Sequence, residues 1–320
     1  MVALQLGGAP AATLGEVKNR ADLIIFWGSN PAESHPRHFT RYSGTAKGRM
    51  NPNGRKDRHV VVVDIRKTPS VKYSDEFIQI KPGNDYEVFT VMRMIANGHI
   101  PDTDMVGGIP LQTLIDLVER CKKARMGVLF FGQGITETKG KHQNSTAIYQ
   151  FGKDMTKHSK FLTLPMRGHY NVVGSGNVMC WQTGYPFAVN FGKGYPRFNP
   201  GEFSVVDLLL RREPDVAVIV AAEPIDHLPY AAAKHLENIP TIVLDPRKTL
   251  TTKIAKVIIP VKHAGVSVEG TAYRMDHIPI KMQAVLESPW PKDDIPLSTI
   301  INRIKKIRSE EKKTDGGKAA

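Results

Sequence analysis

Cysteine is nearly absent from this sequence. Its 320 residues include only Cys121 and Cys180, which stand far apart and form no CxxC pair. Two such cysteines exclude a disulfide framework and cannot ligate an iron–sulfur cluster. The 11 histidines form no HxxxH or HExxH pattern, so a metal site built from the protein's own side chains is not expected. Both thiols are predicted to be buried.

Long apolar runs are also missing. None approaches the roughly 18 residues that a membrane-spanning helix requires. The first 22 residues lack the basic opening and apolar block of a secretory signal. We therefore expect a cytoplasmic protein that has no membrane partner.

Aromatic residues are scarce where basic residues gather. The net charge is +13, and basic side chains concentrate in residues 41–58 and 302–313. Binding of single-stranded nucleic acid relies on aromatic side chains interleaved with basic ones, and neither segment has that arrangement. A nucleic-acid partner is therefore not expected. Solvated loops, or surfaces that meet acidic partner subunits or an anionic cofactor, explain the charge better.

An internal repeat is the clearest feature that is present. Residues 64–81 and 245–262 have the same length and both begin D-x-R-K-T after an apolar run. A further apolar run lies upstream in each copy, beginning at residue 23 or 216, and another covers 127–131. Short Val- and Ile-rich runs that alternate with helical stretches indicate buried parallel strands. The sequence predicts an α/β protein with two related doubly wound domains, each with a mostly parallel sheet.

Candidate ligand-binding residues follow these runs, because strand ends and helix N-termini converge at that edge of a parallel sheet. Gly28-Ser29-Asn30 comes directly after one run; Gly allows close backbone approach, and Asn offers a donor and an acceptor. An Asn-Pro turn that starts a helix is the alternative. Glu223 occupies the equivalent place in the second copy, where its carboxylate can accept hydrogen bonds from guanine.

Two acids and a glycine loop extend this set. Asp64 and Asp245 end matched strands, a position where an acid commonly accepts hydrogen bonds from a nucleotide ribose. For either residue alone, capping of the next turn is the alternative. Gly132-Gln133-Gly134 can cradle a phosphate through backbone N–H groups. Because residue 137 is Glu, this loop departs from the GxGxxG fingerprint.

Arg167 and His169 are the best catalytic candidates. An Arg fork pairs bidentately with a small carboxylate, and His titrates near neutral pH. Both lie in residues 165–200, which are crowded with Gly, Asn, Tyr and Pro. Long irregular segments in compact domains are often functional. The alternative is an Arg and a His in a structural network.

Six segments carry a family resemblance: WGSNPAESHP, VVVVDIRKTPSVKYSDEFIQIKPGND, FGQGIT, MRGHYNVVGSGN, AAEPIDHLPYA and EGTAYR. In this order they resemble the molybdopterin oxidoreductase (dimethyl sulfoxide reductase) superfamily, and within it the B-subunit family of archaeal formylmethanofuran dehydrogenases. The resemblance covers about residues 1–290. The stretch from Arg167 to Glu202 is typical of the B-subunit family rather than of formate dehydrogenases in general.

The resemblance implies two molybdopterin guanine dinucleotides that together hold one tungsten or molybdenum atom, each bound by one α/β domain. We expect the first domain over residues 15–165, the second over 1–14 and 166–305, and a flexible tail over 306–320. The residues expected around the first dinucleotide are Gly28, Ser29, Asn30, Asp64, Arg66, Gly83 and Asp85.

Around the other dinucleotide the resemblance places Glu223, Asp245 and the Gly132–Gly134 loop, including Gln133. Arg167 matches the family's active-site arginine, which faces the metal and orients formate or carbon dioxide. His169 lies close to it in the sequence.

The resemblance also implies an oxidoreductase that works only with partner subunits. In this family carbon dioxide is reversibly reduced to formate as the first step of methanogenesis, with electrons from iron–sulfur proteins. An amidohydrolase-like subunit then condenses formate with methanofuran, and a separate β-barrel subunit closes over the pterins.

Two family features have no counterpart in this sequence: the cysteines of a [4Fe–4S] cluster and the Cys or selenocysteine that ligates the metal. We expect another chain to carry both, and a break at a selenocysteine codon is an alternative. Their absence favours a second hypothesis, a catalytically silent scaffold subunit of a formyltransferase/hydrolase complex. Retention of Arg167 and of both sets of nucleotide residues favours the enzyme.

Overall fold

The computed structural model describes residues 10–199 and 201–316. The chain divides into two compact units. The first comprises the described residues up to 173 together with 273–278, and the second comprises 174–272 with the residues from 279 onward. Residues 10–14, grouped with the second domain in the sequence, lie in the first unit, where Ala12 and Leu14 are buried in its core.

The first unit is built on a five-stranded sheet of order β3-β2-β1-β6-β7, in which every neighbouring pair is parallel. The predicted α/β fold with parallel strands is therefore confirmed. The elements of this unit are α2 (Leu14–Arg20), β1 (Leu23–Trp27), α3 (Pro31–Ser34), α4 (His38–Arg41), η1 (Gly54–Asp57), β2 (His59–Asp64), η2 (Pro69–Tyr73), β3 (Glu76–Gln79), α5 (Asp85–Ala96), β4 (Met105–Val106), β5 (Ile109–Pro110), α6 (Leu111–Lys123), β6 (Met126–Phe131), η3 (Gln133–Ile135), α7 (His142–Met155) and β7 (Lys160–Pro165).

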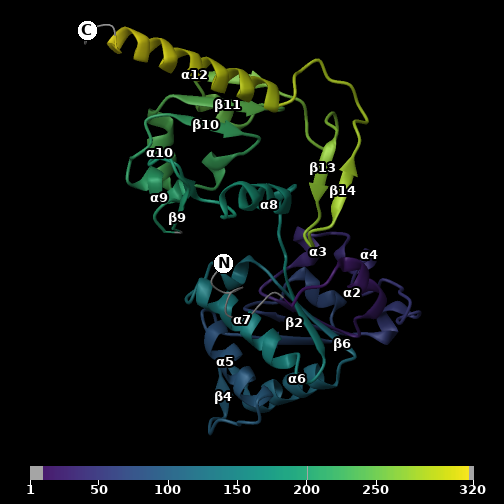
Figure 1. The fold of residues 1–320 in the computed structure, drawn as a ribbon. Helices are drawn as coiled ribbons and strands as arrows, with labels where there is room; N and C mark the ends of the chain where they lie inside the picture. The colour runs from purple at the N-terminus through teal and green to yellow at the C-terminus, as the bar shows by residue number, and fades with distance from the viewer. Residues whose placement is uncertain (1–9, 200, 317–320) are drawn as a thin grey trace. The chain divides into compact units, whose positions relative to one another are not determined.

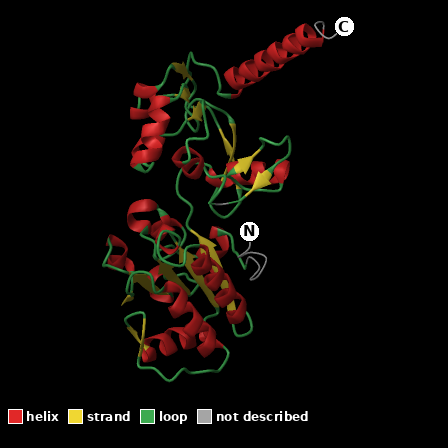
Figure 2. Ribbon diagram, turned by 90° about the vertical axis from the view of Figure 1, so that its left-hand side faces the viewer, coloured by secondary structure: helices red, strands yellow, loops and turns green. Residues whose placement is uncertain are grey.

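Helices cover both faces of this sheet, which explains why the central strands β1 and β6 are buried along their whole length. In β1, Ile25 and Trp27 pack with residues of α5, α6 and α7, whereas Ile24 and Phe26 pack with residues of α2. Figure 1 shows α5, α6 and α7 on one side of β2 and β6 and α2 on the other. Figure 2 shows the yellow strands between red helices.

The strand order creates a switch point between β1 and β6. From β1 the chain continues to β2 and β3 on one side, and later to β6 and β7 on the other. Connections leave in opposite directions at such a point, and parallel sheets commonly bind ligands at the carboxyl ends of the two strands there. The loops after β1 and β6 therefore flank the natural ligand site of this unit.

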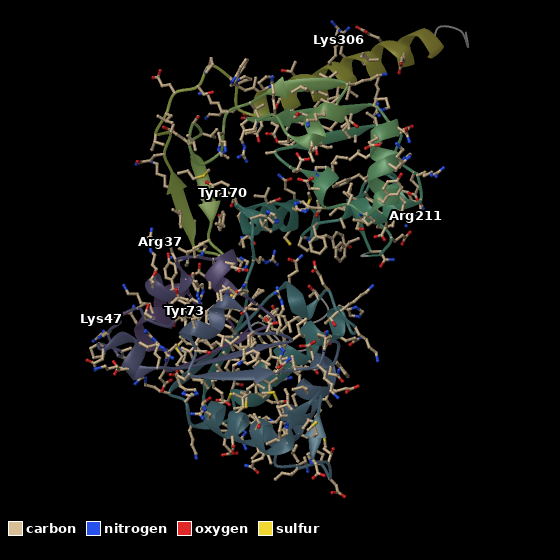
Figure 3. All side chains as sticks on the ribbon, turned by 180° about the vertical axis from the view of Figure 1, so that it is seen from behind. Arg37, Lys47, Tyr73, Tyr170, Arg211 and Lys306 are labelled. Atoms are coloured by element: carbon tan, nitrogen blue, oxygen red, sulfur yellow. The ribbon has the colours of Figure 1, made fainter. Side chains whose placement is uncertain are left out.

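The basic loop at residues 41–58 is tied to the first unit by Arg58. Its guanidinium is buried and donates to the backbone carbonyls of Lys18, Ala21 and Ala46. Lys47, in contrast, is exposed on this loop (Figure 3). The loop thus combines a solvated basic surface with one structural cation that satisfies three carbonyl groups.

The second unit contains a smaller parallel sheet of order β10-β11-β12. Its buried cluster includes Ile219, Leu236 and Val243. Residues 306–316, predicted as part of a flexible tail, continue a helix. The remaining elements are α8 (Val172–Thr183), β8 (Val189–Asn190), β9 (Arg197–Phe198), α9 (Val205–Leu210), β10 (Ala217–Val220), η4 (Pro224–Asp226), α10 (Tyr230–Asn238), β11 (Thr241–Asp245), α11 (Leu250–Ile254), β12 (Val257–Pro260), β13 (Gly270–Tyr273), β14 (Pro279–Met282) and α12 (Asp294–Gly316).

The turn between β13 and β14 belongs to the first unit. Asp276 accepts a hydrogen bond from the backbone N–H of Leu14 at 2.6 Å, across 262 positions of sequence. The guanidinium of Arg274 donates to both carboxylate oxygens of Asp276, each at 2.6 Å. The start of α2 is thereby held by residues from near the end of the chain.

Across residues 10–199 and 201–316, every helix is too short or too polar to span a bilayer.

Candidate functional site

The loops after β1 and β6 touch each other at the carboxyl edge of the first sheet. The N–H of Gly132 donates to the carbonyl of Trp27 at 3.1 Å, and that of Gly134 donates to the carbonyl of Gly28 at 3.2 Å. On the other side, Gly28 donates to Val63 of β2 at 2.9 Å. Two glycine loops far apart in the sequence therefore form one surface at the switch point.

This contact requires glycine at several positions. Gly28 has a φ of +55°, in the left-handed region. A Cβ on Gly132 would lie 2.5 Å from the Gly28 carbonyl oxygen and 2.5 Å from Cβ of Ser29, and one on Gly134 would lie 2.9 Å from the same oxygen. The two loops therefore pack backbone against backbone, with no room for side chains between them.

The Gly132–Gly134 loop does not lie in the same unit as Glu223 and Asp245, with which the resemblance grouped it. It lies against Gly28 and Ser29 of the first unit. Within the loop, the side-chain amide of Gln133 donates to the carboxylate of Glu137. The physical reason is the pairing of β1 with β6, which brings the two glycine loops together.

Ser29 and Asn30 differ in whether their side chains have a hydrogen-bonding group that is free to contact a ligand. The Oγ of Ser29 is buried and has no hydrogen-bond partner among the described residues. The side chain of Asn30 is occupied: it donates to Glu33 at 2.6 Å and accepts from Ser70 at 2.7 Å. Asn30 also directly precedes α3, which begins at Pro31. Its contacts are those of the Asn-Pro turn, whereas Ser29 offers a free polar group.

Two carboxylates lie near this edge, one at the end of β2 and one at the start of α5. Asp64 ends β2, accepts from the backbone N–H of Arg66 at 3.4 Å, and has its pKa raised by burial. Asp85 is the first residue of α5, and its Oδ1 accepts from the indole N–H of Trp27 at 2.9 Å. Burial raises the pKa of Asp85, and the nearby charge of Asp64 raises it further. Arg66 itself is exposed.

A basic loop before α7 also reaches this edge and was not predicted. Gly83, with a φ of +79°, lies so close to it that a Cβ would be 3.2 Å from Cβ of Lys139 and 3.6 Å from Oγ1 of Thr138. Buried Asn144 donates to the carbonyls of Ile135 and Lys139, at 2.8 and 2.9 Å, and fixes the loop. The T-K-G-K segment ahead of a helix was the available signal, because cations at such an edge suit phosphate groups.

Arg167 follows β7, and its guanidinium is not paired with an acid among the described residues. Its side chain is exposed and forms no hydrogen bond or ion pair with any described residue. Its backbone carbonyl accepts from Nε2 of His35 at 2.9 Å, which links the loop after β7 to the loop after β1. Burial raises the pKa of Tyr149 on α7, and Arg167 is close enough to oppose that shift. Sequence reasoning identified neither His35 nor Tyr149.

His169 is less well defined as a site residue. It is exposed and has a φ of +58°, a left-handed conformation uncommon for a side-chain-bearing residue. Its ring makes no hydrogen bond with a described residue, whereas Asn171 accepts from the backbone N–H of Tyr273 at 2.8 Å. The segment after Arg167 is therefore anchored by Asn171 rather than by His169.

The second unit presents two acids at one sheet edge. Glu223 follows β10, and its Oε1 accepts from the N–H and Oγ1 of Thr251 at 2.8 and 2.7 Å. Its Oε2 is buried and has no partner among the described residues. Burial alone would raise the pKa of Glu223, but the nearby Thr249 hydroxyl and the hydrogen bonds from Thr251 lower it. Asp245 ends the adjoining strand β11 and accepts from Arg247 N–H at 2.8 Å.

No three His, Cys, Asp or Glu side chains of the described residues gather closely enough to hold a metal ion. Cys121 is buried in α6, and burial raises the pKa of its thiol. Cys180, on α8, is only half-buried, so the prediction of two buried thiols is wrong for this residue.

The family model for molybdopterin oxidoreductase matches residues 11–292 of the chain. Among curated proteins, the B subunit of tungsten-containing formylmethanofuran dehydrogenase 2 from Methanocaldococcus jannaschii is 46% identical over 310 residues, which cover 96% of this chain and 71% of that protein. The protein of the same name from Methanococcus maripaludis is 43% identical over 289 residues, which cover 90% and 67%. The resemblance stated from the sequence is thus confirmed.

Two solved structures share the fold. A chain of the formyltransferase/hydrolase complex from Methylorubrum extorquens, solved with methylofuran, aligns with a TM-score of 0.76 at 19% identity, over 96% of this chain and 81% of that one. Acetylene hydratase from Pelobacter acetylenicus aligns with a TM-score of 0.59 at 12% identity, over 91% and 48%. At such identities the likeness concerns the fold alone.

Proposed function

Since the chain belongs to the molybdopterin oxidoreductase family and is homologous to the B subunit of formylmethanofuran dehydrogenase, we propose that it is the pterin-dinucleotide-binding subunit of such an enzyme. The proposed reaction is the reversible two-electron reduction of carbon dioxide to formate, CO2 + 2e⁻ + H⁺ → HCOO⁻. The observation that carries the proposal is the free guanidinium of Arg167, on a sheet edge where two glycine loops meet.

The residues at both sheet edges fit guanine dinucleotides. Guanine presents N–H donors, and Asp85 and Glu223 each have a carboxylate oxygen that no other described residue uses. Ser29 lies against the Gly132 loop, and its Oγ lacks a partner among the described residues, so it can donate to a diphosphate oxygen. We propose one dinucleotide per unit, the first bound by the residues around Gly28, Asp64, Asp85 and Gly132, with Asp245 completing the second site.

The cofactor supplies the redox chemistry when bound, and the protein supplies binding and orientation. Arg167 binds the carboxylate of formate through its forked N–H donors and gives carbon dioxide the same orientation. Because this guanidinium has no partner within the described residues, none has to be displaced before substrate binds. His35 holds the backbone of Arg167 in place. Tyr149 supplies a partly buried wall beside it.

Other chains complete the proposed enzyme. No cluster of metal ligands occurs among the described residues, so the metal would be held by the cofactor and by a Cys or selenocysteine from elsewhere. A [4Fe–4S]-bearing chain, a β-barrel subunit and an amidohydrolase-like subunit are the proposed partners. Tungsten is favoured over molybdenum because the two formylmethanofuran dehydrogenase subunits reported above are tungsten-containing by name.

The second candidate function is a catalytically silent scaffold in a formyltransferase/hydrolase complex. It is favoured by one observation, the shared fold at a TM-score of 0.76 with a chain of such a complex. A scaffold has no need of an unpaired arginine or of two carboxylates with unused oxygens.

Elemental analysis of the native complex, isolated through a tag on this chain, separates the two functions. W, Mo and Fe would be measured together with guanine nucleotide released by acid hydrolysis. The enzyme predicts about one W or Mo and about two guanine nucleotides per copy, with a cysteine-bearing partner present. A complex without metal and without guanine nucleotide would replace the enzyme by the scaffold.

A further inference from the structure

Trp27 connects the loop after β1 to the start of α5. It is the last residue of β1 and is fully buried. Its indole N–H donates to Oδ1 of Asp85 at 2.9 Å, and its ring packs on Phe89, one turn further along α5, with centroids 4.3 Å apart. A single side chain therefore fixes α5 by a polar contact and an apolar contact, while Gly28 follows it in the ligand loop.

Asp85 needs such a donor to remain ionised. The residue is 5% exposed, and burial favours its protonated form. Among charged groups on the surrounding elements, Asp64 at the end of β2 adds repulsion that acts in the same direction. Lys139, in the loop before α7, lies beside Gly83 two residues away. The indole hydrogen bond opposes both burial and the repulsion by Asp64, because it stabilises the carboxylate.

We propose that Trp27 is a positioning residue that keeps the Asp85 carboxylate ionised and oriented for hydrogen bonds from the guanine nucleotide of the first unit. The inference rests on the proposed function. Trp27 lies beneath the site and acts only through Asp85. Its donor occupies Oδ1, and no hydrogen bond from another described residue reaches Oδ2.

The chemistry of indole suits this role better than that of a basic side chain. The indole N–H can only donate, so Trp27 cannot accept hydrogen bonds from the ligand's N–H groups in place of Asp85. It also carries no charge, and the carboxylate keeps its full negative charge for the guanine edge. A Lys or Arg at this position would form an ion pair with Asp85 and reduce the negative charge that is available to the ligand.

In the second unit the carboxylate of Glu223 is held in the same way, with one oxygen bonded by the protein and the other unused. Oε1 of Glu223 is held by two donors of Thr251, and Oε2 is buried without a partner among the described residues. In both units one oxygen is anchored by a neutral protein donor and the other is left over. The two units use different donors, so a change at Trp27 affects the first unit alone.

The test compares native complexes isolated through tagged wild-type, Trp27→Phe and Phe89→Leu chains. Each complex is held at a series of values from about pH 5.5 to 8.5 and gel-filtered, and the retained guanine nucleotide is then quantified. Trp27→Phe should lose guanine from about two to about one per copy as pH falls, with a midpoint about one pH unit above that of the wild type. Phe89→Leu disturbs the same packing but should keep the wild-type midpoint.

Asp85→Asn provides a second variant that preserves the core, because its amide oxygen still accepts from Trp27. It should hold about one guanine per copy at every pH, since the charge that binds the ligand is gone. Equal midpoints for Trp27→Phe and Phe89→Leu, or a wild-type guanine content in Asp85→Asn, would overturn the inference. Absence of guanine from the wild-type complex would instead overturn the proposed function.

Discussion

Arg167 is the residue on which the proposed chemistry depends most directly. Replacement by Lys keeps the charge and loses the planar fork that pairs with both oxygens of formate. We expect kcat/KM for formate oxidation to fall about 100-fold, because a carboxylate held by one donor is less well oriented. The assay is dye-linked formate oxidation by the native complex.

Metal and guanine contents should not change in the Arg167→Lys complex. Arg37→Lys is the matched control, since Arg37 is an exposed arginine on the same unit (Figure 3). If Arg167→Lys retained the wild-type kcat/KM, Arg167 would have no role in binding formate.

His38 is a buried histidine that makes the first unit sensitive to acid. It is 3% exposed, packs edge-on against Phe130, and has Nε2 without a partner among the described residues. Burial, with a smaller effect of His35, lowers the pKa of His38 to about 3. The unfolded chain takes up this proton near pH 6.5 and the native one does not, so stability falls as pH drops through that range.

Replacement of His38 by Phe should remove this component. Between pH 7.5 and 5 the wild type should lose about 2 kcal/mol of unfolding free energy that the variant keeps, by the linkage relation. Urea unfolding at the two pH values measures it, with His99→Phe as an exposed control. Equal acid sensitivity in wild type and His38→Phe would show that another group is responsible.

Single residues could be predicted from the sequence only where their type is itself informative. Arg167, Asp64 and Glu223 could be named as candidates because each carries its chemistry in its side chain and lies at or after the end of a strand. His35 was missed because its role depends on a contact with Arg167, 132 positions away. Trp27 stands in the sequence as part of an apolar strand, since only the fold brings its N–H to Asp85.

At the scale of elements, the contact between the loops after β1 and β6 should be sensitive to a single methyl group. Gly132→Ala would place Cβ 2.5 Å from the Gly28 carbonyl oxygen, so one loop must move. We expect a loss of stability of about 1–3 kcal/mol. We also expect about one guanine nucleotide per copy instead of about two, because the first site is deformed.

Gly168→Ala is the control, since a Cβ there would meet no atom within 4 Å. Thermal unfolding and guanine content of the native complexes are the measurements. Full guanine content in Gly132→Ala would exclude this loop from dinucleotide binding.

Strands were more predictable than their arrangement. Residues 60–63 are four consecutive valines that are all fully buried, a pattern that indicates a central parallel strand by itself. The neighbours of each strand depend on tertiary pairing, so the repeat could not tell that the Gly132 loop lies beside Gly28. Residues 306–316 were expected in a flexible tail and are helical in the structure, where Ile300, Ile304 and Ile307 continue a helical period.

At the scale of the whole molecule, two units with separate cores should unfold separately when no cofactor is bound. The second unit's buried cluster is small, with five buried apolar residues among those described. Ligands that bind only the folded state stabilise it by mass action. We expect the cofactor-free chain to melt in two steps, both well below the transition of the native complex.

Calorimetry of the isolated chain and of the complex tests this expectation. In the cofactor-free chain, Gly132→Ala should lower the transition of the first unit and leave that of the second unchanged. One cooperative, high-temperature transition of a cofactor-free monomer would contradict it.

The hydrogen bond from Leu14 to Asp276 also limits when the first unit can complete its folding during synthesis. Every strand of the first sheet has been made once residue 165 is complete, yet the carboxylate that caps the start of α2 is still 111 residues ahead (276 − 165). At a translation rate of about 5–20 residues per second, that interval lasts on the order of ten seconds. During it the first unit has its whole sheet but lacks the Leu14–Asp276 hydrogen bond, which forms only after the segment that carries Asp276 has been made.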